Sequence, residues 1–203
     1  MKKIENFLSD SERLEILKFI DSLNIEFDIT NKHIIEVASK LKGQSWMFDI
    51  SKTELSSNLS NFQSSNNVSD IKLPDIFFNL LDRISKTLEI NKDNVFLQIL
   101  NQTPGGLIHP HYDSALDGYI TYKCNISVES EDFQLFVGDD ILNISSGDLY
   151  CFEASLYKHW TNQLKKRRIT LSYGIILPYK DMGRNGDCPR VRLSKRIIKY
   201  FQN

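Results

Sequence analysis

Two short stretches of this 203-residue sequence hold residue types that together bind a redox metal. The first contains His111-Tyr112-Asp113, and in an extended strand residues i and i+2 point to the same side, so His111 and Asp113 would share a face. The second supplies His159, 46 positions beyond Asp113. Two imidazoles and one carboxylate suit a non-haem Fe(II) ion and leave coordination positions open for O2. We therefore predict that His111, Asp113 and His159 bind Fe(II).

The sequence has four histidines, and His109 is a second candidate ligand in the first stretch. A straight strand would place His109 and His111 on one face. Pro110 between them removes a backbone donor and commonly marks the beginning or edge of a strand. We favour His111 as the ligand and assign His109 to the surroundings of the metal or to the substrate, with His109 as the alternative ligand. The other alternative has no metal: His111 and Asp113 form an ordinary hydrogen-bonded pair, and His159 lies at the surface.

The β-type run that follows the second stretch separates into an apolar and a polar face. The polar face comprises Arg168, Thr170 and Ser172. If this face points inward beside the metal, Arg168 gives a bidentate pair with a carboxylate of a cosubstrate, and Thr170 adds a hydroxyl. Arg167 would then face solvent. The reverse orientation of the strand would make Arg168 a surface cation.

The first half of the sequence predicts helices. Ser9 and Glu12 have the spacing of a capping box, and apolar residues follow at helical spacing: Leu14, Ile16, Leu17, Ile20 and Leu23. Pro74 at the first helical position, with Asp75 behind it, begins a strongly amphipathic helix. Its apolar positions are Phe77, Leu80, Leu81, Ile84 and Leu88. Residues 31–41 have a weaker helical pattern, and residues 44–51 have the character of a strand.

After Asn91 the pattern changes to short β-type runs separated by turn residues. The runs are 95–102, 119–128, 133–137, 141–144, 149–152 and 169–177. Regular short strands of this kind predict a sandwich or jelly roll, and hence an α+β fold in which the strands are buttressed by N-terminal helices. We expect one domain over residues 1–203, with mainly helical support in 1–92, the jelly-roll core in 93–178 and a basic C-terminal segment in 179–203.

Composition and charge indicate where the protein is located and which partners it does not bind. The formal net charge of -1 gives no global attraction to nucleic acid or to an anionic membrane. The three cysteines form no C-x-x-C pair, which argues against a disulfide framework or a structural zinc site. No run approaches the roughly 20 apolar residues of a membrane span. These observations predict a cytoplasmic protein without membrane contact, and they leave its oligomeric state open.

The sequence leaves the roles of two segments undecided. Residues 53–70 are crowded with Ser and Asn and form either a solvated connector or a lid over the site. From Lys180 onward the chain has seven Lys/Arg and two Asp. Arg184 or Arg190 in this segment is either part of a solvated surface or a partner for a substrate carboxylate.

Residues from about 96 to 177 resemble the Fe(II)/2-oxoglutarate-dependent oxygenases, and most of all the aspartyl/asparaginyl β-hydroxylase group, which includes proline hydroxylases. The resemblance is carried by Pro104-Gly105-Gly106-x-Ile108-x-Pro110-His111-x-Asp113, by Gly147-Asp148 and Phe152, and by His159, Asn162 and Arg168. It implies a double-stranded β-helix with His111, Asp113 and His159 as iron ligands, Arg168 on the distal carboxylate of 2-oxoglutarate, and O2 as the oxidant. It further implies hydroxylation of an unactivated C–H bond, because Asp113 is present where halogenating relatives have a small residue.

This chain differs from the aspartyl/asparaginyl group at one pair of positions. The aspartyl/asparaginyl group has an Arg-x-His pair on an intermediate strand near the cosubstrate, and the aligned positions here are Lys123 and Asn125. Lysine can still supply a charge, but asparagine does not replace imidazole chemistry. We predict that Lys123 and Asn125 lie in the cosubstrate site.

Two other functions share part of this pattern. An AlkB-like nucleic-acid oxidative demethylase has a similar Pro-His-x-Asp motif but carries a second arginine after the distal histidine, where this chain has Thr170-Leu171-Ser172-Tyr173-Gly174. The basic C-terminal segment keeps this alternative open, since clustered cations contact phosphates. A cupin-like module would hold a metal or ligand without turnover. We favour a hydroxylase of a small molecule, such as an amino acid or an amino-acid-derived metabolite, and nothing in the sequence identifies the substrate further.

Overall fold

The computed structural model describes residues 1–22, 45–49, 73–90, 95–102, 104–105, 108, 110–113 and 118–179. For residues 45–49, and for residues 96 and 101, it describes the backbone alone. Several predicted features lie outside the described residues: helix 31–41, the Ser/Asn-rich segment 53–70, His109, and the C-terminal segment beyond Tyr179.

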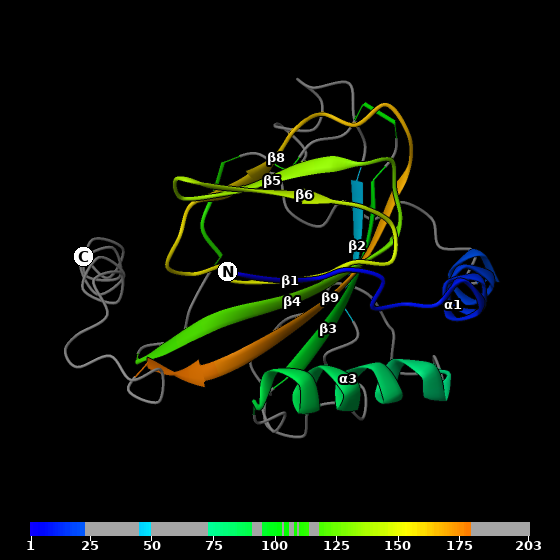
Figure 1. Cartoon of the computed structure of the whole chain (residues 1–203), viewed down its shortest axis with the longest axis horizontal. Coiled ribbons are helices and arrows are strands. Elements are labelled where there is room, and N and C mark those ends of the chain that lie inside the picture. Colours follow the sequence, from blue (N-terminus) through cyan, green and yellow to red (C-terminus); the bar gives the residue numbers. More distant parts are fainter. Residues whose placement is uncertain are drawn as a thin grey trace, which may run out of the picture.

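Two antiparallel sheets form the body of the described structure, with the smaller sheet over one face of the larger (Figure 1). The larger sheet has the order β1-β7-β4-β9-β3-β2, and its strands are β1 Lys2–Ile4, β2 Ser45–Asp49, β3 Val95–Gln102, β4 Tyr119–Glu129, β7 Leu149–Glu153 and β9 Arg168–Pro178. The smaller sheet has the order β6-β5-β8, and its strands are β5 Phe133–Val137, β6 Asp140–Ile144 and β8 His159–Thr161. The arrangement is jelly-roll-like, as the sequence predicts.

Two helices, α1 (Asp10–Ser22) and α3 (Asp75–Leu88), pack with the larger sheet on the side away from the smaller one. Figure 1 shows α3 running below the larger sheet. The helices also touch each other, through an edge-to-face contact of Phe19 and Phe77 with ring centroids 5.2 Å apart. Neither helix in this part of the chain has the length and hydropathy that crossing a membrane requires.

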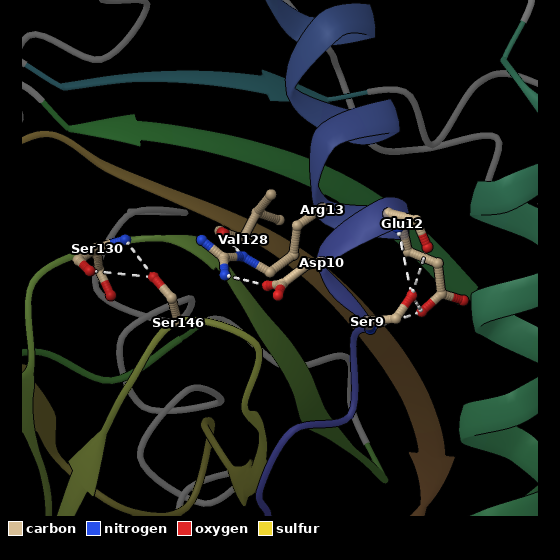
Figure 2. Close-up of polar contacts among 8 residues, drawn as sticks. Ser9, Asp10, Glu12, Arg13, Val128, Ser130 and Ser146 are labelled. Carbon is tan, nitrogen blue, oxygen red and sulfur yellow. Dashed lines mark hydrogen bonds and ion pairs between the residues drawn. The ribbon is translucent and has the colours of Figure 1, made fainter.

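The predicted capping box at the start of α1 is confirmed (Figure 2). The Ser9 backbone N–H donates to Glu12 Oε2 over 2.8 Å, and the Glu12 N–H donates to Ser9 Oγ over 3.3 Å. The prediction that Leu14 faces the core is wrong, because this side chain is 58% exposed. Ile16 and Ile20, one helical turn apart, are the buried residues of α1, and a helix that buries this face must turn position 14 outward.

Arg13 connects α1 to an irregularity in β4. The pairing of β4 with β9 shifts register between Ser127 and Glu129, as at a β-bulge. A bulge leaves a residue outside the ladder, and the Val128 carbonyl accepts a 2.9 Å hydrogen bond from Arg13 Nε instead (Figure 2). Beside it, Ser146 Oγ donates to the Ser130 carbonyl over 3.0 Å and accepts from the Ser130 N–H over 2.8 Å. Side chains thus hydrogen-bond to the backbone at the register shift, through Arg13, and just after it, through Ser146.

Helix α3 confirms the predicted amphipathic pattern. Phe77, Leu80, Leu81 and Ile84 are buried as expected, Ile76 joins them, and Leu88 is partly buried. Pro74 takes the N-cap position rather than the first helical position. Tyr173 of β9 donates a 2.9 Å hydrogen bond to the Phe77 carbonyl, which fixes the helix on the sheet.

Alternation along the long strands creates two separate interiors. Outward positions of β3, β4, β7 and β9 form an apolar core with the helices. Inward positions face the smaller sheet, and there a second core combines Phe133, Leu135, Val137, Ile144, Tyr150, Phe152, Ala154 and Leu164. Because successive strand residues point to opposite faces, both sides of the larger sheet are buried. The six predicted β-runs correspond to β3, β4, β5, β6, β7 and β9, and run 44–51 contains β2, whereas β1 and β8 were not predicted.

Candidate metal centre

The inward face of the larger sheet is unusually polar for a buried surface. Its buried polar side chains come from three adjacent strands: Gln98 and Gln102 of β3, Arg168, Thr170 and Ser172 of β9, and Lys123 and Asn125 of β4. Register places them side by side, since Ser172 lies opposite both Gln98 and Asn125. This layer contains four of the predicted site residues.

Backbone pairing brings the three predicted metal ligands together at the edge of this layer. His111 and His159 form an isolated antiparallel bridge, with N···O distances of 3.1 and 2.8 Å. The Asp113 N–H donates to the Ala154 carbonyl, just after β7, over 3.0 Å. Residues 111–113 therefore form a single bridge followed by irregular backbone rather than the extended strand that we expected.

The three side chains converge on one point. Asp113 Oδ1 lies 3.2 Å from His111 Nε2 and 3.6 Å from His159 Nε2, and one ligand atom from each residue lies within 4.8 Å of the others. The His159 Nδ1 atom is 3.2 Å from the Tyr157 carbonyl. Because a carbonyl oxygen only accepts, this contact places the ring proton on Nδ1 and leaves the Nε2 lone pair facing the other two ligands.

The charges of this group suit a cation. Burial lowers the pKa of His159 to about 4, although the Asp113 carboxylate opposes the shift. Burial would raise the pKa of Asp113, but the charge of Lys123 and the contacts with His111 and His159 outweigh it and hold this pKa well below its usual range. A neutral imidazole and an ionised carboxylate are the forms that ligate a metal. At neutral pH His159 and Asp113 are therefore already in the protonation states that bind a metal ion.

Arg168 lies in the same interior, facing inward as predicted. Its side chain is 1% exposed, and the guanidinium carbon is 4.7 Å from the centre of the Phe133 ring. Within the described part of the chain, Arg168 Nε and Nη1 have no hydrogen-bond partner. Arg167 faces outward, where it pairs with Asp21 over 3.0 Å. The predicted orientation of this pair of arginines is thus confirmed.

Other buried polar atoms around Arg168 make no hydrogen bond of good geometry among the described residues: Gln102 Oε1, Asn125 Oδ1, Thr170 Oγ1 and Ser172 Oγ. The Tyr150 hydroxyl lies beside Asn125 and Thr170. Buried polar groups are almost always hydrogen-bonded, so such a cluster asks for an explanation. A cation with two free N–H groups and neighbouring hydroxyls matches the needs of a carboxylate. The cluster has the composition of an anion site.

A continuous series of ring contacts connects Arg168 with the metal-ligand group. Phe133 beneath Arg168 meets Tyr150 at 6.1 Å, Tyr150 stacks with Phe152 at 6.5 Å, and Phe152 meets His159 at 4.9 Å. These rings belong to the second core. Arg168 and the three predicted ligands therefore share one wall of one interior.

Lys123 has contacts that the sequence did not suggest. Its Nζ donates to Gln98 Oε1 over 2.7 Å and lies 3.5 Å from Asp113 Oδ2. Gln98 and Gln102 were missed as site residues. Their signal was the alternation of β3, where Val95, Leu97 and Ile99 are buried on the apolar side, so that positions 98 and 102 had to face the opposite interior.

Comparison with known proteins identifies relatives by structure alone. Neither a protein-family model nor a curated protein sequence matches the chain. A prolyl-4-hydroxylase from Pseudomonas putida is similar with a TM-score of 0.57 and 12% identity, over 86% of this chain and 90% of that chain. A viral collagen prolyl hydroxylase from Paramecium Bursaria Chlorella virus-1, solved as a 2OG complex, is similar with a TM-score of 0.54 and 14% identity, over 87% and 94%. The chain has the fold of these prolyl hydroxylases, and at such identities the likeness reaches no further than the fold.

Proposed function

We propose that the protein is an Fe(II)/2-oxoglutarate-dependent dioxygenase that hydroxylates an unactivated C–H bond of an amino acid or an amino-acid-derived metabolite. One observation carries the proposal: a buried arginine, whose Nε and Nη1 have no hydrogen-bond partner among the described residues, shares an interior with a converging His-Asp-His group. The first feature suits a dicarboxylate and the second suits Fe(II). The jelly-roll-like sheets would accordingly be a double-stranded β-helix, and residues 1–203 one oxygenase domain.

In this proposal His111, Asp113 and His159 hold Fe(II). Arg168 and Thr170 bind the distal carboxylate of 2-oxoglutarate, and Asn125 lies close enough in register to contact the cosubstrate. When bound, Fe(II) and 2-oxoglutarate supply the O2 activation that C–H hydroxylation requires. The protein's own part is to orient these groups and to exclude water, for which Phe133, Tyr150 and Phe152 provide an apolar wall.

The surroundings of Arg168 strengthen an ionic contact. Burial lowers the pKa of Arg168 from its ordinary value, but a guanidinium remains charged at neutral pH. An ion pair in such a low-dielectric interior is stronger than one at the surface. A dicarboxylate of the right length would thus be selected over a monocarboxylate, because only the former offsets the buried positive charge.

The free thiols of Cys124 and Cys151 agree with the reducing cytoplasm that we propose as the location. The similar structures are named as hydroxylases of proline and of collagen. Proline, free or within a peptide, is therefore the first substrate to test alongside other amino acids.

An anaerobic titration tests the proposed site. Fe(II) and 2-oxoglutarate added together should give the weak visible charge-transfer band of a chelated 2-oxo acid, and succinate in place of 2-oxoglutarate should give none. The His159→Ala variant, verified as folded by circular dichroism, should lack the band. A wild-type protein without the band would contradict the proposal and favour a module that binds ligand without turnover.

A second assay addresses the substrate. Succinate release is measured over amino acids and proline-containing peptides, with His159→Ala as the blank. Turnover that depends on the added compound and is absent from the variant supports a hydroxylase. Equal release by both proteins would remove His159 from the proposed ligands.

A further inference from the structure

The lysine beside the metal-ligand group is held on both sides. Lys123 is 8% exposed. Its Nζ donates to Gln98 Oε1 over 2.7 Å and approaches Asp113 Oδ2 to 3.5 Å. A buried ammonium with a neutral partner on one side and a carboxylate on the other has little freedom to leave this position.

The route of the Lys123 side chain depends on the strand order. Lys123 belongs to β4 and Gln98 to β3, and β9 lies between these strands in the sheet. The side chain must therefore cross the inward face of β9 to reach its partner. Directly opposite Lys123 on β9 is Gly174, which has no side chain to obstruct this crossing. The sequence of β9 thus leaves a passage at the position where the lysine needs one.

The two oxygens of Asp113 are divided between different neighbours. Oδ2 faces Lys123, whereas Oδ1 faces both His111 Nε2 and His159 Nε2. A carboxylate without a second contact rotates and can offer either oxygen, or both, to a cation. The contact with Lys123 removes that freedom by occupying Oδ2.

We propose that Lys123, tethered by Gln98, is a positioning residue that reserves Asp113 Oδ2 and presents Oδ1 alone to the metal. The inference rests on the proposed function and deepens it. It also gives Lys123 a task different from the cosubstrate contact that the sequence predicted. Gln98, which touches neither the imidazoles nor Asp113 in the described contacts, acts only through Lys123.

Two physical effects of Lys123 on metal binding have opposite signs. Its positive charge repels a divalent cation, so simple Coulomb repulsion predicts tighter metal binding when the charge is removed. Its hold on Asp113 orients a ligand, and loss of partners that orient metal ligands typically weakens metal binding by about 10–100-fold. The proposal requires the second effect to be larger.

The test uses Co(II), a divalent ion with a ligand-sensitive visible spectrum, titrated calorimetrically into the metal-free full-length protein. Lys123→Met should weaken Co(II) binding by about tenfold or more and alter the spectrum. Gln98→Leu keeps the charge and loses the tether, so it should shift binding in the same direction by a smaller factor. Lys123→Arg keeps a cation that can reach Asp113 and should restore most of the wild-type affinity.

The other outcomes contradict either the positioning role of Lys123 or the proposed function. Unchanged or tighter Co(II) binding by Lys123→Met, with the wild-type spectrum, would overturn the positioning role. If Lys123→Met weakens only the binding of 2-oxoglutarate to Co(II)-saturated protein, Lys123 is a cosubstrate ligand and the inference is wrong. If the wild type binds no Co(II), or His159→Ala binds it equally well, the proposed function itself fails. Should Lys123→Met not fold, Gln98→Leu still decides between the two effects, because it keeps the charge and removes the tether: weaker Co(II) binding supports the positioning role, and unchanged binding contradicts it.

Discussion

Asp148 and Arg168 are both buried charged side chains, and their surroundings are opposite. Asp148 is 3% exposed and Arg168 is 1% exposed. The Asp148 carboxylate accepts from the Asn6 N–H over 3.2 Å and from the Ser145 N–H over 2.9 Å, and it pairs with Lys3 over 3.1 Å. Arg168 Nε and Nη1 have no such partner among the residues that the structure describes.

We interpret Asp148 as a charge that stabilises the fold and, on the proposed function, Arg168 as a charge that binds a ligand. The partners of Asp148 come from the N-terminal strand region and from the turn before β7, so this carboxylate joins two distant parts of the chain. The described residues do not offset the desolvation of Arg168 in the same way, which makes its burial costly unless another group supplies an anion. Removing the first charge should therefore damage stability, and removing the second should damage binding.

Arg168→Met should have the largest effect. Loss of one member of a buried charge pair costs about 2–5 kcal/mol, so 2-oxoglutarate should bind the Co(II)-loaded variant at least about 30-fold more weakly. The ligand-free melting temperature should not fall, because an unpaired buried cation is removed. Calorimetry and thermal unfolding measure the two quantities, with the outward-facing Arg167→Met as the matched control. An unchanged affinity for 2-oxoglutarate would contradict the assignment.

Asp148→Ala should have the reverse profile. Two backbone N–H groups and Lys3 lose their acceptor, and we expect the free energy of unfolding in urea to fall by about 2–3 kcal/mol. The affinity of the folded variant for 2-oxoglutarate should equal that of the wild type. Asp10→Ala, which removes a surface ion pair with Arg13, should cost less than about 1 kcal/mol. If Asp148→Ala and Asp10→Ala lost equal free energy of unfolding, the structural role of Asp148 would be contradicted.

Thr170→Val tests the same comparison with a nearly isosteric substitution, which replaces the hydroxyl by a methyl group. The buried Oγ1 makes no hydrogen bond of good geometry in the described structure, but the Tyr150 hydroxyl lies beside it, so its removal should change ligand-free stability by less than about 1 kcal/mol. The same change should weaken 2-oxoglutarate binding by about five- to tenfold if the hydroxyl donates to the carboxylate. A loss of stability like that of Asp148→Ala would show that Thr170 is structural.

Ser9→Ala should have the smallest effect. It removes the side-chain acceptor of the capping box, which typically costs about 0.5–1 kcal/mol. This exposed group lies outside both buried sites, so metal and 2-oxoglutarate affinities should match those of the wild type. Chemical unfolding and calorimetry check this, and any change in affinity would mean that stability and binding are coupled through α1.

Long periodic segments were predictable from the sequence. Strand β3 has the predicted bounds, and the inward placement of Arg168 and Thr170 follows from alternation along β9. Short elements were not predictable: β1 and β8 have three residues each, too few for a period to be recognised. The exposure of Leu14 depends on how α1 sits against the sheet, and residue spacing does not encode that choice.

The site was predictable in its residue types and less so in its contacts. The convergence of His111, Asp113 and His159 agrees with their spacing and type. The contact of Lys123 with Gln98 depends on where β3 and β4 lie in the sheet, with β9 between them, and nothing in the local sequence gives the order of strands in a sheet. The lack of hydrogen-bond partners for Arg168 Nε and Nη1 among the described residues likewise depends on tertiary packing, which residue spacing does not give.

A crystal structure of the protein grown anaerobically with Mn(II), as a redox-inert substitute for Fe(II), and 2-oxoglutarate tests the central claim most directly. The account predicts one carboxylate of 2-oxoglutarate within hydrogen-bonding distance of Arg168 Nε and Nη1, and Mn(II) bonded to His111, Asp113 and His159. A structure in which Arg168 stays without an anionic partner while 2-oxoglutarate binds elsewhere, or in which the metal avoids these three residues, would contradict it.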